Sequence, residues 1–368
     1  MDLTEFEINS YKIQISNNLD ISNLEKDWLH IEAQENVPFF LSWKWISCWL
    51  KTYSPEVTIV KAIVDLNTVA IGLFTRAQEK RHRFIKSSQY RLHQTGIANQ
   101  DQIWIEYNDI ISFKPHKLDA FNACIKGLMK FDDCDEVLIS MMPENRAIEV
   151  LDSFHGAQKI LEIPGYSANL SNAKLISDKY LATLNRNTRY QINRSVKIYK
   201  NKYGSLALSK AMSSEEALKL FYEAGELHKE RWTDSGYNNT EFVQFHVNLI
   251  KDSFQNVDLI KISAGEDLIA ILYFLKIDQT VYFYLQGIKY EDDKKLKPGL
   301  VAHSLASQYY MDQNLDLYDY MGGYSQYKKQ LAAESVKMVS IKIQKPKLIF
   351  KLENFARSIK NKTYNNFV

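Results

Sequence analysis

The side chains with the clearest chemistry in this 368-residue chain form a cluster of cations. Residues 184–204, LNRNTRYQINRSVKIYKNKYG, contain six basic residues and no acidic one. Guanidinium groups stay protonated, so they suit the binding of an anion better than proton transfer. On a helix, one face would carry Arg186, Arg189, Asn193, Lys197 and Lys200. A solvated helix face has the same pattern, so an anionic ligand and plain solvent remain alternatives.

His228 is a second candidate, because imidazole titrates near neutral pH and can move protons. It lies one helical turn before Trp232. One interpretation is an acceptor pocket with His228 at its base and Trp232 in its wall. A structural histidine on a helix is the alternative.

Several classes of site are missing from the sequence. None of the 13 glycines forms a G-x-G, which excludes a dinucleotide fingerprint and a Walker loop. The three cysteines form no C-x-x-C and the histidines no H-E-x-x-H, so we expect no metal site. Asp133-Cys134-Asp135 spells the D-x-D of metal-dependent glycosyltransferases, but it falls at the end of an expected helix. The formal net charge of +2 argues against a general nucleic-acid binder.

The two ends of the chain bear on its location. The acidic first residues lack the apolar stretch of a signal peptide, and we expect a cytoplasmic protein without a transmembrane segment. The tail, residues 346–368, is basic and amphipathic, with one stripe formed by Leu348, Leu352, Phe355 and Ile359. We expect it to dock on its own domain. A peripheral contact with a membrane is the alternative.

The elements that must position these residues occur in two copies. Residues 45–76 align without a gap to residues 245–276, and each segment is typical of helix, strand, tight turn and strand. Lys114-Pro115-His116 then matches Lys297-Pro298-Gly299, and each opens a helix that leads to a short strand. A helix that returns to a strand implies parallel pairing. We predict two related α/β domains, residues 1–160 and 161–345, followed by the tail.

The second copy resembles the GNAT acyltransferase superfamily, specifically its double-domain branch. That branch includes the CelD-like acetyltransferases and, more remotely, the Fem-type aminoacyl transferases. The resemblance covers about residues 20–345 and implies tandem GNAT-like domains, each a mixed twisted sheet flanked by helices. The motifs that carry it are R-x-x-R-Y-x-I-x-R (Arg186–Arg194), His228-x-x-x-Trp232, Lys297-Pro298-Gly299, and D-Y-M-G-G from Asp319 followed by Tyr327-Lys328.

The resemblance also implies where a donor would bind. In GNAT enzymes two strands splay apart to hold the pantetheine arm of acyl-coenzyme A, and a helix N-terminus binds its pyrophosphate. We expect acyl-coenzyme A as a co-substrate and no permanently bound cofactor. The loop at residues 288–299, which leads to Gly299, is poorer in glycine and arginine than the usual GNAT loop, which leaves room for another donor. The expected donor contacts are Gln286, Gly287, Lys297, Gly299, Leu300 and Val301.

The same resemblance assigns catalytic and acceptor-binding roles. Tyr327 would be the general acid near the leaving thiolate, Asp319 a base or an orienting group, and His228 a further catalytic candidate. The first copy has His116 in place of Gly299 and Met141-Met142 in place of the Gly-Gly turn. We predict that it has lost the donor site and helps to wall the acceptor cleft. Substrate contacts are expected from Arg186, Arg189, Arg194, Trp232, Tyr284 and Lys328.

Three functions follow as hypotheses. The first is an N-acyltransferase that acylates an amine or hydroxyl of an amino sugar or of a cell-envelope or polysaccharide precursor, which could be lipid-linked. The second is a Fem-like transferase that takes its donor from aminoacyl-tRNA. The third is a non-catalytic scaffold in polysaccharide assembly.

Overall fold

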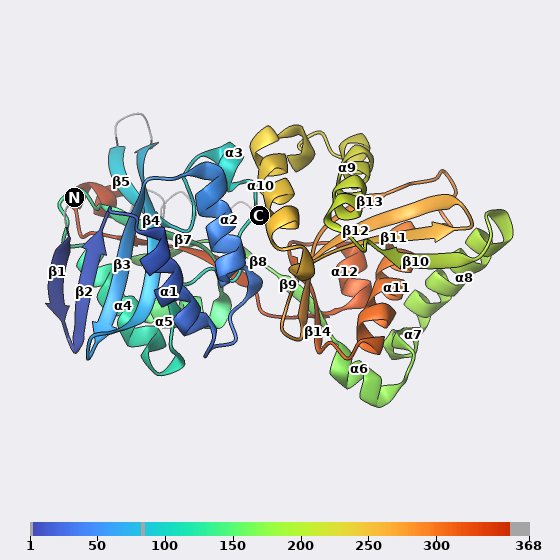
Figure 1. Ribbon diagram of the computed structural model, residues 1–368, viewed down its shortest axis with the longest axis horizontal. Coiled ribbons are helices and arrows are strands. Elements are labelled where there is room, and N and C mark those ends of the chain that lie inside the picture. Colours follow the sequence, from blue (N-terminus) through green and yellow to red (C-terminus); the bar gives the residue numbers. More distant parts are fainter. Residues whose placement is uncertain (1–2, 82–84, 354–368) are drawn as a thin grey trace, which may run out of the picture.

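The computed structural model describes residues 3–81 and 85–353, which form two mixed sheets lying side by side with helices packed against them (Figure 1). The predicted fold class, tandem α/β domains, is confirmed. Among the described residues, no helix is both long enough and apolar enough to cross a membrane.

The first sheet has the strand order β1-β2-β3-β4-β5-β7-β16-β8, with β6 paired to β4. Its strands are β1 (Thr4–Ile8), β2 (Tyr11–Ser16), β3 (Val57–Val64), β4 (Asn67–Arg81), β5 (Ile85–Leu92), β6 (Ile111–Ser112), β7 (Glu136–Pro143), β8 (Ala157–Ile163) and β16 (Met338–Gln344). Its helices are α1 (Ile21–Glu32), α2 (Trp43–Tyr53), α3 (Ala98–Asp101), α4 (Lys117–Leu128) and α5 (Glu144–Ser153).

The second sheet has the order β10-β11-β12-β13-β14-β9-β15. Its strands are β9 (Gly165–Asn169), β10 (Leu206–Lys210), β11 (Val257–Ala264), β12 (Asp267–Ile277), β13 (Thr280–Ile288), β14 (Leu317–Gly322) and β15 (Ala333–Glu334). Its helices are α6 (Leu170–Ile176), α7 (Tyr180–Thr183), α8 (Arg186–Lys202), α9 (Ser214–Arg231), α10 (Thr240–Asp252), α11 (Pro298–Asp312) and α12 (Gln326–Leu331).

The two sheets repeat one topology, as the aligned sequences indicate. Strands β3 and β11 begin exactly 200 residues apart, and each pairs with the next strand through a register shift at the same place, Ala62/Ile63 and Ile262/Ser263. In each sheet an antiparallel meander ends in one parallel pair, β5 with β7 and β13 with β14. The equivalent residues Trp45 and Phe245 pack against each other, with ring centroids 4.7 Å apart, in a core that spans both copies.

The two copies also exchange a strand. β9 follows the first copy in sequence, yet it pairs with β14 in the second sheet. β16 follows the second copy and pairs with β7 and β8 in the first sheet. The predicted boundary at residues 160/161 falls inside β8 of the first sheet, and residues 338–344, predicted for the second domain, also belong to the first sheet.

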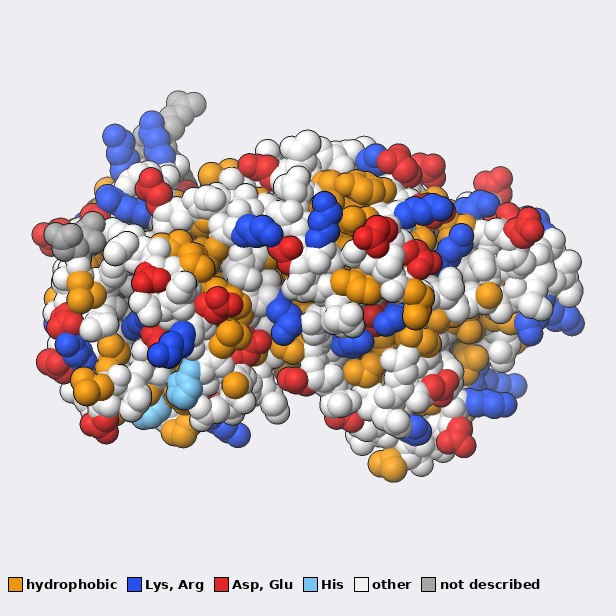
Figure 2. Space-filling model, in the orientation of Figure 1, with side chains coloured by type: hydrophobic (Ala, Val, Ile, Leu, Met, Phe, Trp, Pro, Cys, Tyr) orange, Lys and Arg blue, Asp and Glu red, His pale blue; other side chains and the backbone are white. Residues whose placement is uncertain are grey.

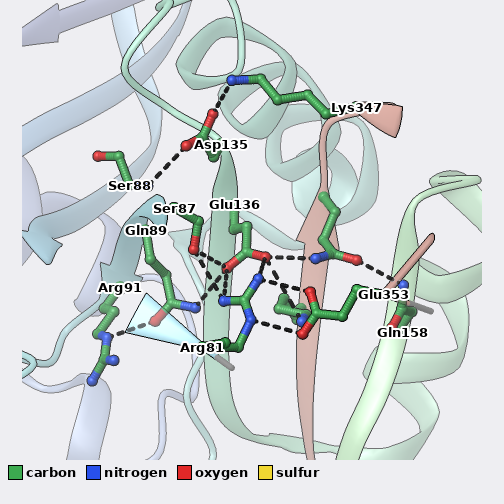
Figure 3. Close-up of polar contacts among 12 residues, drawn as sticks. Arg81, Ser87, Ser88, Gln89, Arg91, Asp135, Glu136, Gln158, Lys347 and Glu353 are labelled. Carbon is green, nitrogen blue, oxygen red and sulfur yellow. Dashed lines mark hydrogen bonds and ion pairs between the residues drawn. The ribbon is translucent and has the colours of Figure 1, made fainter. Parts of the chain in front are cut away.

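The start of the tail docks on the first domain (Figure 3). The guanidinium of Arg81 lies between Glu136, at 2.7 Å, and Glu353, at 2.9 Å. Glu353 and Phe350 are buried, whereas Leu348 and Leu352 are exposed. The other two members of the predicted stripe, Phe355 and Ile359, lie outside the described residues.

The acidic D-x-D motif takes part in this docking and in the first domain's surface. Asp135 forms an ion pair with Lys347 of the tail, and Asp133 one with Arg76 at 2.8 Å. Figure 2 shows Lys and Arg side chains interspersed with Asp and Glu over the visible face, in keeping with the small net charge. No group of three or more metal-ligating side chains occurs within the described ranges.

Candidate active site

The parallel strands β13 and β14 separate part-way along their length. They pair only from Thr280–Leu317 to Tyr282–Asp319. Beyond that point β13 continues along β12, whereas Gly322 at the end of β14 pairs with Gly165 of β9. The two strands diverge here, as the resemblance to GNAT enzymes implies.

A β-bulge lies on β13 at the point of divergence. The register shifts between Tyr273 and Phe274 of β12, which makes Tyr284 the extra residue of β13. A bulged residue is left out of the regular ladder, so its backbone N–H is a candidate donor to a developing oxyanion. The equivalent pair β4 and β5 keeps its register throughout the described pairing. The sequence gives no signal of this bulge.

A cavity of about 170 Å³ lies where the strands separate, and both domains contribute to it. From the first domain comes the segment that joins β5 to β6, residues 93–110, here called the crossing loop. The tyrosine hydroxyl of Tyr284 donates to the carbonyl of Ile103 in this loop. The lining residues are Gln102, Trp104, Glu106, Phe242, Phe283, Tyr284, Leu285, Tyr320, Met321, Gly322 and Lys328.

Three charged side chains gather around the Met321–Gly323 turn. Glu106 of the crossing loop is fully buried and accepts hydrogen bonds from the backbone N–H of Gly322, at 2.9 Å. Lys328 lies on the other side of the turn and donates to the carbonyls of Met321, at 3.2 Å, and Gly322, at 2.7 Å. Asp319 is buried and accepts from the backbone N–H of Met321 and from the hydroxyl of Tyr107, again in the crossing loop.

Burial moves the pKa of all three groups toward neutrality. It raises the pKa of Asp319 to about 6, although hydrogen bonds from Tyr107 and Met321 and the charge of Lys328 oppose the rise. Burial and then the charge of Asp319 raise the pKa of Glu106. Burial lowers the pKa of the Lys328 ammonium, against the pull of the two carboxylates. Groups poised in this way are candidates for proton transfer.

Tyr327, predicted as the general acid, lies on the opposite side of the divergence in a group of buried rings. Its ring stacks on His303 of α11, with centroids 5.0 Å apart and an interplanar angle of 10°. The His303 imidazole contacts the hydroxyl of Tyr318 at 2.7 Å and Gln286, a predicted donor contact, at 3.1 Å. Burial lowers the pKa of His303 to about 3, so the ring stays neutral, and burial raises the pKa of Tyr327, so its phenol stays protonated.

Of the predicted donor contacts at the start of α11, Gly299 faces open space. A Cβ built on Gly299 would meet nothing within 4 Å, whereas Leu300 and Val301 are buried. The backbone N–H of Lys297 is already bonded to Ser195 of α8, at 2.9 Å. Gly287 lies against α9, and its Cβ would come within 2.6 Å of the Ala224 backbone, so this glycine is explained by packing.

The predicted substrate residues are not all brought together. Arg189 donates to the backbone carbonyls of Ala182 and Leu184, at 2.8 and 2.9 Å, which ties α8 to the preceding turn. Arg194 lies over the ring of Tyr190, and its buried Nε has no hydrogen-bond partner within the described structure. Arg186 is exposed at the start of α8.

His228 and Trp232 lie at the end of α9. The His228 Nδ1 contacts the hydroxyl of Ser235 at 2.8 Å, and burial lowers its pKa. Trp232 is 57% exposed, with the Arg231 guanidinium over its ring. Neither residue lines the cavity as it is described. The assigned roles of both stay predictions.

The corresponding divergence in the first copy is filled by the chain itself. Asn108 of the crossing loop is fully buried. Its side-chain amide donates a hydrogen bond to the carbonyl of Leu92 in β5, at 3.0 Å. Its backbone N–H donates to Met141 in β7, at 3.2 Å. This bridge between the two strands supports the prediction that the first copy has no donor site.

Comparisons with known proteins agree with this geometry. Residues 186–329 match the family model described as "Acetyltransferase (GNAT) domain". Residues 186–329 are therefore a GNAT domain. The helix α8, the bulged strand β13, the helix α11 and Lys328 all fall within the matched region of this GNAT domain. The chain is accordingly an acyltransferase. No curated protein sequence matches it significantly.

Solved structures share the fold of the whole chain, including the region before the GNAT domain. FemX has a TM-score of 0.58 at 11% identity, with 91% of this chain and 98% of FemX covered. A conserved protein of unknown function from Bacteroides thetaiotaomicron has a TM-score of 0.56 at 11% identity, with 90% and 99% covered. A tandem GNAT protein from the clavulanic acid biosynthesis pathway has a TM-score of 0.50 at 8% identity, with 91% and 99% covered.

The structure adds site residues that the sequence did not reveal. Trp104, Glu106 and Tyr107 occur in a loop without periodicity, and nothing in the sequence places that loop beside the second domain. His303 had a weak signal, since it follows the Lys297-Pro298-Gly299 helix start by about one turn. The sequence analysis singled out His228 instead.

Proposed function

We propose that the chain transfers an acyl group, acetyl in the first instance, from acyl-coenzyme A to an amino or hydroxyl group of an amino sugar or of a cell-envelope or polysaccharide precursor. The observation that carries the proposal is the divergence of β13 and β14 at a bulge, beside a cavity with poised carboxylates. Diverging strands leave backbone groups available to a pantetheine arm, and the bulge offers an N–H to the thioester carbonyl.

The start of α11 supports the donor assignment. Pro298 has no N–H, and the N–H of Lys297 is bonded to Ser195. The N–H groups that could bind a ligand at this helix start are therefore those of Gly299 and Leu300. Such groups bind pyrophosphate, and the open space at Gly299 lets it approach. We propose that Arg194, which precedes Ser195 in α8, adds positive charge at this helix start.

The acceptor nitrogen or oxygen would lose its proton to Asp319 or Glu106, the carboxylates whose pKa is raised. It would then attack the acyl carbonyl, so that a bond to the acyl carbon forms and the C–S bond breaks. The leaving thiolate would take a proton from Tyr327, which burial keeps protonated.

Calorimetry with coenzyme A and acetyl-coenzyme A tests the donor directly. We expect binding that weakens when Gly299 is replaced by a bulkier residue such as Gly299→Val. Tyr327→Phe should lower turnover, measured as thiol release with an amine acceptor, more than it weakens donor binding. No heat at millimolar ligand with an intact fold would refute the donor assignment, and unchanged turnover would remove Tyr327 as the acid.

A tRNA-dependent transfer is the second candidate, because α8 presents an exposed basic face with Arg186, Lys197 and Lys200. Binding of tRNA that weakens steeply with salt would favour it. Failure to bind either donor would favour the scaffold hypothesis.

A further inference from the structure

The cavity between the domains has an aromatic lining. Phe242, Phe283 and Tyr320 are buried, whereas Trp104 of the crossing loop is 46% exposed and forms the outer wall. The cavity volume of about 170 Å³ is below the roughly 300–1,000 Å³ of pockets that enclose a whole small-molecule ligand. The cavity therefore accommodates one end of a molecule rather than a whole sugar nucleotide.

Trp104 is held in place despite its exposure. Its backbone φ is 47°, a left-handed conformation that is costly for a bulky residue and that persists where the surroundings enforce it. Its indole N–H donates to Glu106, at 2.8 Å. The carboxylate that binds the Gly322 turn of the GNAT domain therefore also fixes the ring at the mouth of the cavity.

The ionisable groups near the Trp104 ring carry a net negative charge when all of them are ionised. Glu106 lines the cavity, Asp319 lies close enough to raise the pKa of Glu106, and Lys328 is the one cation beside them among the described residues. The phenols that face this cluster belong to Tyr107, Tyr282 and Tyr284, and burial raises the pKa of each, so they stay neutral. Two carboxylates against one ammonium leave an uncompensated charge.

We propose that Trp104 and Glu106 of the first domain select the acceptor, by receiving its reactive group as an ammonium inside this aromatic cavity. Aromatic faces attract cations, the more strongly when water is excluded, and the surplus carboxylate charge adds to this attraction. A neutral hydroxyl or an anionic group gains neither interaction. The proposal rests on the proposed function only in naming the bound molecule as the acceptor.

Binding without any donor tests the proposal. The probes are ethanolamine and glucosamine, each compared with a neutral partner of similar shape, ethylene glycol and glucose, followed by calorimetry and tryptophan fluorescence. We expect each amine to bind at least tenfold more tightly than its neutral partner. Trp104→Leu, which keeps an apolar side chain without a ring face, should weaken amine binding at least tenfold, and Trp104→Phe about threefold.

Tyr222→Ala is the matched control, because Tyr222 is 51% exposed on α9 and lies outside the cavity. Its amine binding should equal that of the wild type. Glu106→Gln should weaken amine binding and leave that of glucose unchanged. Amines that bind no better than their neutral partners, or Trp104→Leu binding as the wild type does, would overturn the proposal. Amine binding without coenzyme A binding would overturn the proposed donor and leave this inference standing.

Discussion

The buried carboxylate of Asp319 should make the protein less stable as pH rises, and Asp319→Asn should relieve that cost. Its pKa rises from an ordinary value of 3.8 to about 6. One pKa unit is worth 1.36 kcal/mol, so the shift of about two units corresponds to about 3 kcal/mol. The ionised side chain destabilises the native state by that order because burial removes its hydration.

Whether stability rises or falls with pH depends on which state, native or unfolded, holds the Asp319 proton more tightly. Below about pH 3.8 the carboxyl is protonated in both states and contributes nothing. Between pH 3.8 and 6 the unfolded chain loses the proton first, so wild-type stability falls, and above pH 6 the cost is constant. Asparagine can still accept from the Met321 N–H and can donate to Tyr107, so its stabilisation relative to the wild type should grow by 2–3 kcal/mol from pH 4 to pH 7.5.

Urea unfolding at pH 4, 5.5 and 7.5, followed by tryptophan fluorescence, measures this difference. Asp292→Asn is the control, because it makes the same change of side chain at an exposed position. The asparagine variant should also lose acyl transfer if Asp319 is the base. A stability difference between Asp319→Asn and the wild type that stays flat across this pH range would refute the reasoning.

Three further substitutions test packing and docking. Arg81→Met should cost about 3–5 kcal/mol in unfolding free energy, because it leaves the buried Glu136 and Glu353 without their shared cation (Figure 3); urea unfolding measures it, and a loss below 1 kcal/mol would contradict it. Gly287→Ala should lower the melting temperature and distort the site, since its Cβ would clash with the backbone of α9. Gly299→Ala should fold at least as stably as the wild type, because its Cβ enters open space and alanine favours a helix by about 1 kcal/mol; an unchanged melting temperature for Gly287→Ala would contradict the first expectation, and a lowered one for Gly299→Ala would contradict the second.

The repeated architecture could be predicted because it is written in local patterns. The helix, strand and turn signals of residues 45–76 and 245–276 depend on residues close in sequence. In the structure the equivalent strands β3 and β11 begin 200 residues apart, as the alignment predicts. The divergence of β13 and β14 was implied by the resemblance to GNAT enzymes. Of the residues predicted for this site, Lys328 lines the cavity, whereas Gln286 contacts His303, on whose ring Tyr327 stacks.

The contacts that depend on long-range pairing could not be predicted. Strand β16 has no feature that directs it to β7 rather than to the second sheet, since a buried apolar strand fits either. The crossing loop is polar and aromatic without a period, so its contacts with the second domain could not be predicted from its sequence. The bulge at Tyr284 depends on register, which one residue of slippage would change.

The crossing loop gives the first copy, for which we predict no donor site, a part in the proposed reaction. In the GNAT domain the loop between β13 and α11 leaves the strands apart, whereas in the first copy Asn108 bonds to both β5 and β7 and closes the gap. The bonds of Asn108 also fix the two residues before it in the loop. Glu106 accepts from the backbone N–H of Gly322, and Tyr107 donates to Asp319, both in the other domain. The hydrogen bonds that link β5 to β7 through Asn108 thus anchor the loop that lines the cavity of the GNAT domain, and a change at Asn108 should alter the proposed site without contacting it.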